Sequence, residues 1–241
     1  MARLPRASQG GIIYHVLNRG NARQRLFFSD LDYILFLSLL ALAQQRIPMR
    51  IISYCLMPNH WHLLVWPYLD GEISKFMHWL CVTHTQRWHL LNQTIGYGHI
   101  YQGRFKSFPV EQNFHLMTVA RYIERNALRA KLVTKAQDWK WGSLHQSMSD
   151  EVNFNVPKLE PFPIERFNDW AGYVNCEEPS AELAKLRLSN ERGRPYGSEV
   201  WTKEISLMLG ITQSLRNKGG QSKPPLLNHS EQGAKINDEG S

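Results

Sequence analysis

Two histidines stand two residues apart in an apolar run, "CLMPNHWHLLVWP", at residues 55–67. Because side chains alternate across a β-strand, His60 and His62 are expected to point to one face, with Trp61 on the other. Two neighbouring imidazoles on a rigid strand are suitable ligands for a metal ion. The same pattern also fits two ordinary surface histidines, so other groups must lie nearby before it indicates a site.

A tyrosine and an asparagine at helical spacing are candidates for those groups. Tyr122 and Asn126, in "RYIERNALRAKLV", are four residues apart and would share one helix face. Asn126 could supply an oxygen to Mg²⁺ or Mn²⁺ and leave coordination positions open for phosphate oxygens. A phenol beside a cation that polarises a phosphodiester is suited to nucleophilic attack on DNA. The alternative for Tyr122 is an ordinary half-buried helix tyrosine.

The order of the predicted elements indicates how these groups could meet. Strands are expected at about 12–18, in "MRIISYCLM", in "HWHLLVW" and in "FKSFPVE"; helices are expected from Ser29 or Asp30 to Pro48, over 73–91 and over "NFHLMTVARYIERNALRAKLV". The order β-α-β-β-α-β-α predicts an α+β fold, a ferredoxin-like (split βαβ) antiparallel sheet with an added C-terminal helix. The histidine strand is central in this topology, and the added helix can lie across the face that carries the histidines.

Charge divides the chain unevenly. The net charge is +7, with a balance of +9 over residues 1–150 and −2 over residues 151–241. We expect a catalytic domain at 1–148, an acidic linker at 149–182, a basic helical DNA-binding appendage at 183–218 and a disordered tail at 219–241. A basic first domain suggests a polyanionic partner such as nucleic acid, although a solvated basic surface would give the same balance.

The cysteines and the apolar runs of the sequence indicate a cellular compartment. The three cysteines, Cys55, Cys81 and Cys176, form no CxxC pair, which argues against a zinc ribbon or a disulfide framework and favours a reducing cytoplasm. The polar and basic N-terminal residues are not expected to act as a signal peptide, and the longest apolar run, Tyr33–Ala43, is too short to span a bilayer. Six other histidines lack comparable spacing and are expected to be structural: His15, His78, His84, His89, His99 and His115.

Several stretches together resemble one enzyme family. "MPNHWHLLVWP" resembles the His-hydrophobe-His (HUH) element of single-tyrosine transposases, and "RYIERNALRAKLV" is similar to their nucleophile helix. "YHVLNRGNARQRLFF" and "YQGRFKSFPVE" resemble the family's first and fourth strands. "RGRPYGSEVW" resembles a C-terminal element of the REP-associated tyrosine transposases. The resemblance covers about residues 10–145 and 190–203.

The resemblance implies a role for each matched residue. His60, His62 and Asn126 match the metal ligands, and Tyr122 matches the nucleophile that forms a 5′-phosphotyrosine and frees a 3′-OH. A second 3′-OH would then attack that linkage and rejoin the strands. The implied cofactor is Mg²⁺ or Mn²⁺. Ala127 stands where the family usually has Pro, so the helix is expected to run straighter there.

The implied partner is single-stranded and hairpin DNA of the REP type. Candidate phosphate contacts are Arg19, Arg23, Arg25, Arg104, Lys106, Arg125, Arg129, Arg192 and Arg194. Tyr101, Phe105 and Trp61 could stack on bases, or could equally be core residues. The protein is expected in the cytoplasm, nucleoid-associated when DNA-bound, as a monomer or homodimer without a membrane partner.

Two other functions fit parts of the sequence. One is a metal-dependent hydrolase, although such enzymes usually add further His and Asp ligands on a larger barrel. The other is a catalytically silent regulator that binds hairpin DNA. Replacing Tyr122 with Phe would leave a hydrolase active, and a regulator would form no covalent adduct with DNA.

Overall fold

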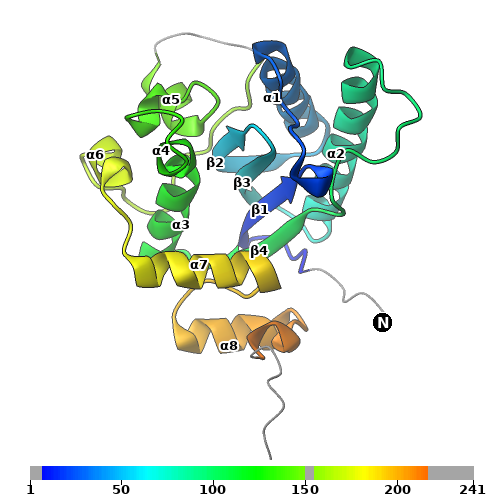
Figure 1. Cartoon of the computed structure of the whole chain (residues 1–241). Coiled ribbons are helices and arrows are strands. Elements are labelled where there is room, and N and C mark those ends of the chain that lie inside the picture. Colours follow the sequence, from blue (N-terminus) through cyan, green and yellow to red (C-terminus); the bar gives the residue numbers. More distant parts are fainter. Residues whose placement is uncertain (1–6, 150–154, 217–241) are drawn as a thin grey trace, which may run out of the picture.

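The centre of the protein is a sheet of four antiparallel strands in the order β2-β3-β1-β4. The computed structural model describes residues 7–149 and 155–216. Its strands are β1 (Ile13–Arg19), β2 (Met49–Met57), β3 (His60–Pro67) and β4 (Lys106–Val110). β1 and β3 are the central pair, so the predicted α+β class and ferredoxin-like strand order are confirmed (Figure 1).

Helices cover both faces of the sheet. α1 (Asp30–Arg46) and α2 (Glu72–Leu91) pack together on one face, and α3 (Phe114–Glu124) lies on the other (Figure 1). Along β3, Trp61 and Leu63 belong to the core beneath α1 and α2, whereas Leu64 belongs to the core beneath α3. Because side chains alternate along a strand, His60 and His62 share the α3 face with Leu64.

A tight turn holds the start of the histidine strand. Pro58 and Asn59 alone separate β2 from β3, as the sequence predicts. The turn is also tied to the chain that follows β1: the Gly20 N–H donates to the Asn59 carbonyl and the Leu26 N–H to the Pro58 carbonyl, both at 2.8 Å. These bonds fix the backbone on which His60 begins β3.

The helix predicted as one continuous element around Tyr122 is interrupted. α3 ends at Glu124, and α4 (Asn126–Arg129) begins after Arg125, whose ψ of −4° departs from the α-helical value. The helical hydrogen bonds nevertheless continue, because the Arg125 N–H donates to the Arg121 carbonyl at 2.8 Å and the Arg129 N–H to the Arg125 carbonyl at 2.8 Å. Tyr122 and Asn126 therefore remain one turn apart.

The C-terminal part packs onto the same body. Residues 149–182, expected to be a linker, contain α6 (Trp170–Asn175) and the start of α7 (Ser180–Arg192). Trp170, Val174 and Leu186 are buried in the cluster that lies beneath α3. α7 runs alongside β4, and α8 (Glu199–Met208) lies beyond it (Figure 1). The tail expected at 219–241 lies outside the described residues.

The shorter helices connect these parts. They are α5 (Ser143–Met148) and the 3₁₀ turns η1 (Asn21–Arg23), η2 (Ala136–Asp138) and η3 (Thr212–Leu215). No helix in the described ranges is both long and apolar enough to cross a membrane. Cys55 is buried in the core, and all three cysteines are free thiols.

Both edges of the sheet are covered by later parts of the chain. On β4, Tyr196 donates its N–H to the Pro109 carbonyl at 2.9 Å and accepts the Glu111 N–H at 3.0 Å. On β2, the Leu56 N–H donates to the Trp141 carbonyl at 2.9 Å. Pro109 is compatible with β4 because an edge strand tolerates a residue that lacks an N–H. Covered edges cannot pair with other chains.

A buried carboxyl group connects α3 to the segments that follow it. Glu124 is 5% exposed and accepts hydrogen bonds from the Ser143 hydroxyl and from the Trp170 indole N–H, both at 2.7 Å. Burial raises the pKa of Glu124 above its ordinary value, and these two hydrogen bonds oppose that shift. Trp170 is therefore both a core residue and a donor that satisfies a buried acceptor.

We predict that Trp170→Phe will lower the free energy of unfolding by about 1–3 kcal/mol, because Phe keeps an aromatic ring but leaves Glu124 without one donor. Urea denaturation of the full chain measures this value. The control is Phe167→Leu, at an aromatic residue that is 43% exposed, which should change it by less than about 0.5 kcal/mol. Equal stability of Trp170→Phe and the unchanged protein would contradict the prediction.

Candidate active site

A cavity of about 600 Å³ opens on the α3 face of the sheet, between the ends of β1 and β3, α3 and α7. Imidazole, phenol, amide and cationic side chains line its walls. The lining residues are Leu17, Asn18, Arg19, His60, His62, Gln102, Gly103, Arg104, Lys106, Tyr122, Asn126, Arg129, Arg187, Asn190 and Glu191. The structure therefore places His60, His62, Tyr122 and Asn126 on one cavity.

The two histidines of β3 have the geometry that their spacing suggests. Their ring centroids are 5.0 Å apart and the rings are nearly perpendicular. The Nδ1 of His60 lies 2.6 Å from Oδ1 of Asn59, and the Nδ1 of His62 lies 2.8 Å from Nε2 of His15. In metal-binding histidines, one ring nitrogen typically binds the metal and the other ring nitrogen forms a hydrogen bond.

Burial keeps both imidazoles neutral. Burial, together with the nearby positive charges of Arg19 and Arg129, lowers the pKa of His60 to about 4. The pKa of His62 is well below its ordinary value, first because of burial and then because of neighbouring His15 and His60. A neutral ring has a lone pair available for a cation at neutral pH, so these residues suit metal binding.

The tyrosine ring lies next to His62. Tyr122 is 9% exposed, and its ring centroid is 5.9 Å from that of His62. The amide Nδ2 of Asn190, from α7, donates to the Tyr122 hydroxyl at 3.3 Å. The guanidinium carbon of Arg129 lies 4.2 Å from the Tyr122 ring centroid. Burial raises the pKa of the phenol above its ordinary value, and the charge of Arg129 opposes that rise.

The donor set fits a hard or borderline divalent cation. Asn126 is 7% exposed and lines the cavity one turn after Tyr122, so an amide oxygen can join the two imidazoles. Within residues 7–149 and 155–216, no group of three or more His, Cys, Asp or Glu side chains could hold an ion. The fit thus depends on Asn126 as the third donor beside His60 and His62.

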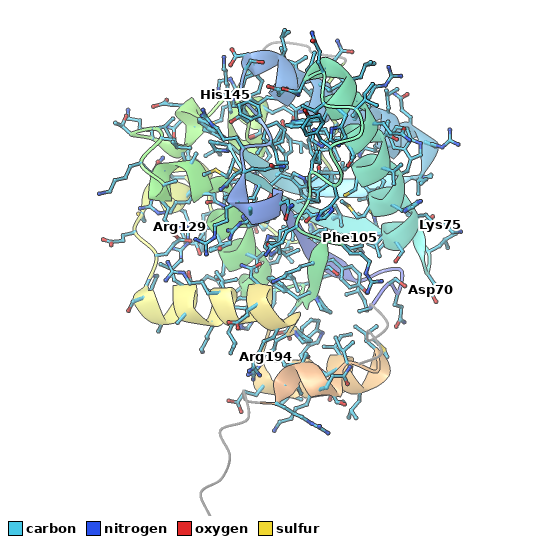
Figure 2. The ribbon with its side chains drawn as sticks, turned by 45° about the vertical axis from the view of Figure 1, so that its right-hand side comes forward. Asp70, Lys75, Phe105, Arg129, His145 and Arg194 are labelled. Carbon is cyan, nitrogen blue, oxygen red and sulfur yellow. The ribbon has the colours of Figure 1, made fainter. Side chains whose placement is uncertain are left out.

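Four of the nine cations expected to contact DNA line the cavity. These are Arg19, Arg104, Lys106 and Arg129. Arg23 and Arg25 are exposed on and after the turn that follows β1, and they are not among the lining residues. Arg129 lies on the α3 side of the molecule, above α7, on the opposite side from Lys75 of α2 (Figure 2). The cavity mouth is therefore positively charged and open toward a polyanion.

The other candidate cations have different surroundings. Arg125 donates to the carbonyls of Val174 and Asn175 at 3.2 and 2.5 Å, so its guanidinium is engaged with α6 rather than with the cavity. Arg192 donates to the carbonyl of Arg216. Arg194 lies where the chain passes from α7 to α8 (Figure 2). Arg125 thus holds the C-terminal part onto the helix break.

A buried carboxylate positions Arg129. Glu178, between α6 and α7, accepts two hydrogen bonds from one guanidinium nitrogen of Arg129 at 2.7 and 2.9 Å. The Nε of Arg125 lies 3.5 Å from the same carboxylate, whose side chain is 2% exposed. Another guanidinium nitrogen of Arg129 donates to the Tyr122 carbonyl at 3.1 Å. Glu178 therefore fixes the cation that lies over the tyrosine ring.

The aromatic residues considered for base stacking are core residues. Trp61, Tyr101 and Phe105 are each at most 6% exposed and belong to the cluster under α1 and α2. The Trp61 indole N–H donates to the Tyr101 hydroxyl at 3.1 Å, and Nδ1 of His84 lies 2.7 Å from that hydroxyl. These contacts stabilise the face of the sheet opposite the cavity.

Three residues of the site were not singled out from the sequence. His15, expected to be structural, stacks on His62 with centroids 5.0 Å apart, and Arg187 and Asn190 line the cavity from α7. The period of two along β1 puts His15 on the same face as Arg19, so strand pairing with β3 could have indicated it. No local pattern in α7 indicates that this helix returns to the sheet.

Comparison with known proteins gives a family and a fold. A family model described as "Transposase IS200 like" matches residues 8–126. A solved structure described as "Structure of the REP associates tyrosine transposase bound to a REP hairpin" is 16% identical, with a TM-score of 0.51, over 69% of this chain and 99% of that chain. A solved structure described as "Crystal structure of a putative transposase from deinococcus radiodurans r1 at 1.90 A resolution" is 17% identical, with a TM-score of 0.37, over 51% of this chain and 96% of that chain. No curated protein matches.

We predict that Glu178→Gln will lower the free energy of unfolding by about 3 kcal/mol, because it leaves Arg129 and Arg125 without the buried charge that they share. The matched control is Glu177→Gln, at the exposed neighbouring residue, which should cost less than about 0.5 kcal/mol. Chemical denaturation of both variants gives the two values. A similar loss in both would mean that the Glu178 ion pairs contribute little.

Proposed function

Because this chain belongs to the IS200-like family of tyrosine transposases, we propose that its cavity cleaves and rejoins single-stranded DNA through Tyr122. The proposal depends on the position of the Tyr122 side chain. The phenol of Tyr122 lines the same cavity as two neutral imidazoles and several cationic side chains. The centroid of the Tyr122 ring is 5.9 Å from that of the His62 ring. A nucleophile, a cation site and phosphate-binding charges are the parts that phosphoryl transfer requires.

The reaction is a transesterification at phosphorus. The Tyr122 oxygen bonds to the scissile phosphorus, and the bond between phosphorus and the 3′ oxygen breaks. The phenol loses one proton and the departing 3′ oxygen gains one, so the reaction needs no net proton, electron or external energy source. In the reverse direction, another 3′-OH attacks the phosphotyrosine and displaces the phenol, which rejoins the strands.

A divalent cation in the proposed site of His60, His62 and Asn126 would supply Lewis-acid stabilisation of charge on the scissile phosphate. The chain's own residues hold the reacting groups in place. Asn59 and His15 orient the two imidazoles through their Nδ1 atoms, and Arg129 stabilises negative charge on the Tyr122 oxygen. Mg²⁺ and Mn²⁺ both accept this mixture of nitrogen and oxygen donors.

We place the DNA backbone along the cations at the cavity mouth. Arg104 and Lys106 are exposed, and neither has an acidic partner in the part of the chain that the structure describes. Arg19 and Arg187 lie on the same cavity from β1 and α7. The structural neighbour is described as bound to a REP hairpin, and this supports a hairpin with an unpaired flank as the substrate here.

One chain supplies every proposed catalytic group. Tyr122 lies beside His62 of its own chain, so the active site does not require a tyrosine from a second copy. We therefore propose that a monomer is sufficient for cleavage. This arrangement also bears on the two alternative functions, since a hydrolase would need no tyrosine beside the cation, and a silent regulator would need no cation site.

We predict that Tyr122→Phe will abolish the covalent protein–DNA adduct, because Phe keeps the ring but lacks the attacking oxygen. The assay is incubation of the full chain and Mn²⁺ with labelled hairpins taken from the DNA that flanks its own gene, followed by denaturing electrophoresis. Tyr97→Phe, at a tyrosine that is 83% exposed, should keep the adduct. EDTA should abolish the adduct in the unchanged protein, and His60→Ala should reduce it by about 100-fold or more.

Other outcomes of this assay support other functions. Cleavage that persists in Tyr122→Phe, without an adduct, would overturn the proposal in favour of a metal-dependent hydrolase. Tight hairpin binding without cleavage in Mg²⁺ or Mn²⁺ would favour the regulator.

We predict that the double change Arg104→Ala and Lys106→Ala will weaken hairpin binding and lower the slope of log Kd against log salt by about 0.7–0.9 per residue removed. Fluorescence anisotropy over a salt series measures the slope. The charge-matched control is Lys75→Ala with Arg87→Ala on α2, across the sheet from the cavity (Figure 2). An equal change in slope for both pairs would show that the charge contribution is not local to the cavity.

A further inference from the structure

α7 contributes a polar contact to the nucleophile although it lies outside residues 8–126. Asn190 donates its Nδ2–H to the Tyr122 hydroxyl at 3.3 Å. Asn190 is partly buried, and the Tyr122 side chain that accepts this bond is 9% exposed. A donor to the phenol oxygen is more valuable when that oxygen carries negative charge, as it does during attack and during departure.

The other end of the Asn190 amide faces a second group of the site. His15 is fully buried, and its Nδ1 has no hydrogen-bond partner among the described residues. The Oδ1 of Asn190 is likewise buried and without a partner of normal geometry in that part of the chain. The pKa of His15 is lowered to about 3 because of burial, and the nearby Asn190 side chain opposes this shift. The Asn190 amide therefore lies close to the His15 ring.

The hydrogen-bond donors and acceptors of these side chains can form one series, from His62 through His15 and Asn190 to Tyr122. If His62 bound a cation through Nε2, its ring proton would lie on Nδ1 and would donate to Nε2 of His15 across the 2.8 Å contact. The His15 proton would then lie on Nδ1, where the side-chain oxygen of Asn190 could accept it. The Asn190 amide N–H donates in turn to Tyr122, so each group in the series has one donor and one acceptor role.

We propose that Asn190 is a positioning residue that couples the phenol of Tyr122 to His15 and, through it, to the cation-binding face of His62. The proposal rests on the proposed function. Asn190 keeps the phenol oxygen as an acceptor, which leaves the phenol proton directed away from α7, and it stabilises the phenolate that rejoining releases.

Contacts with the rest of the fold hold α7, and with it Asn190, in a fixed position. Leu186 is fully buried in the core under α3, and Glu182 forms an ion pair with Arg121 of α3. The helix ends at Gly193, whose φ of +69° is accessible to glycine without strain. These contacts at the start and in the middle of the helix fix the depth at which Asn190 enters the cavity.

The test compares two substitutions of Asn190 in the full chain. Asn190→Ala removes the amide, whereas Asn190→Asp keeps its size and an acceptor for His15 but has no N–H for Tyr122. Each should lower the single-turnover rate of adduct formation by about tenfold at saturating hairpin and Mn²⁺, because one hydrogen bond to the reacting oxygen is lost. In Asn190→Ala, hairpin Kd and the melting temperature should be unchanged. Lys185→Ala, exposed on α7, is the control and should retain the rate.

A second measurement is independent of catalysis. In the metal-free protein, Tyr122→Phe should shift the side-chain amide resonance of Asn190 in a proton–nitrogen correlation spectrum, with the resonance identified by its loss in Asn190→Ala. The ring remains in this variant, so the shift reports the lost hydroxyl.

The outcomes separate this proposal from the proposed function. An active unchanged protein together with an Asn190→Asp variant of equal rate, or an Asn190 amide that does not respond to Tyr122→Phe, would overturn the role of Asn190 alone. An unchanged protein that forms no adduct with any flanking hairpin would overturn the proposed function and this role with it.

Discussion

The packing of α3 across the histidine-bearing face of the sheet is the constraint on which the site depends. Leu116, Val119 and Ile123 are completely buried against that face, and apolar burial of this kind stabilises by about 25 cal/mol per Å². This packing sets the rotation of the helix about its axis. Tyr122 precedes Ile123 at the edge of the buried stripe, and its ring is therefore held 5.9 Å from that of His62.

Burial also determines the charge states around the cavity. It lowers the pKa values of His60 and His62 and raises that of Tyr122, so all three groups are neutral near pH 7. Arg129 lowers the pKa of both His60 and Tyr122. One cation thus favours the imidazole that can bind a metal and the phenolate that can attack phosphorus, which are the two forms that the proposed reaction uses.

The proposed active site includes side chains from the C-terminal part of the chain. Glu178 holds Arg129 over the tyrosine ring, Arg187 extends the cationic wall, and Asn190 reaches the phenol oxygen. All three lie in or after the segment expected to be a linker. Their contacts depend on a core shared by α3, α6 and α7, so division of the chain near residue 148 would separate the nucleophile from groups that orient it.

The sequence by itself determined the features that follow from local periodicity and element order. Alternation along a strand put His60 and His62 on one face, helical spacing put Tyr122 and Asn126 one turn apart, and the order of elements indicated the sheet. Only the tertiary structure decided that His15 and Asn190 join them and that Arg125 turns away to α6. Those facts depend on strand register and on how distant segments pack, and no local pattern encodes either, because the same periodicities are compatible with many packings.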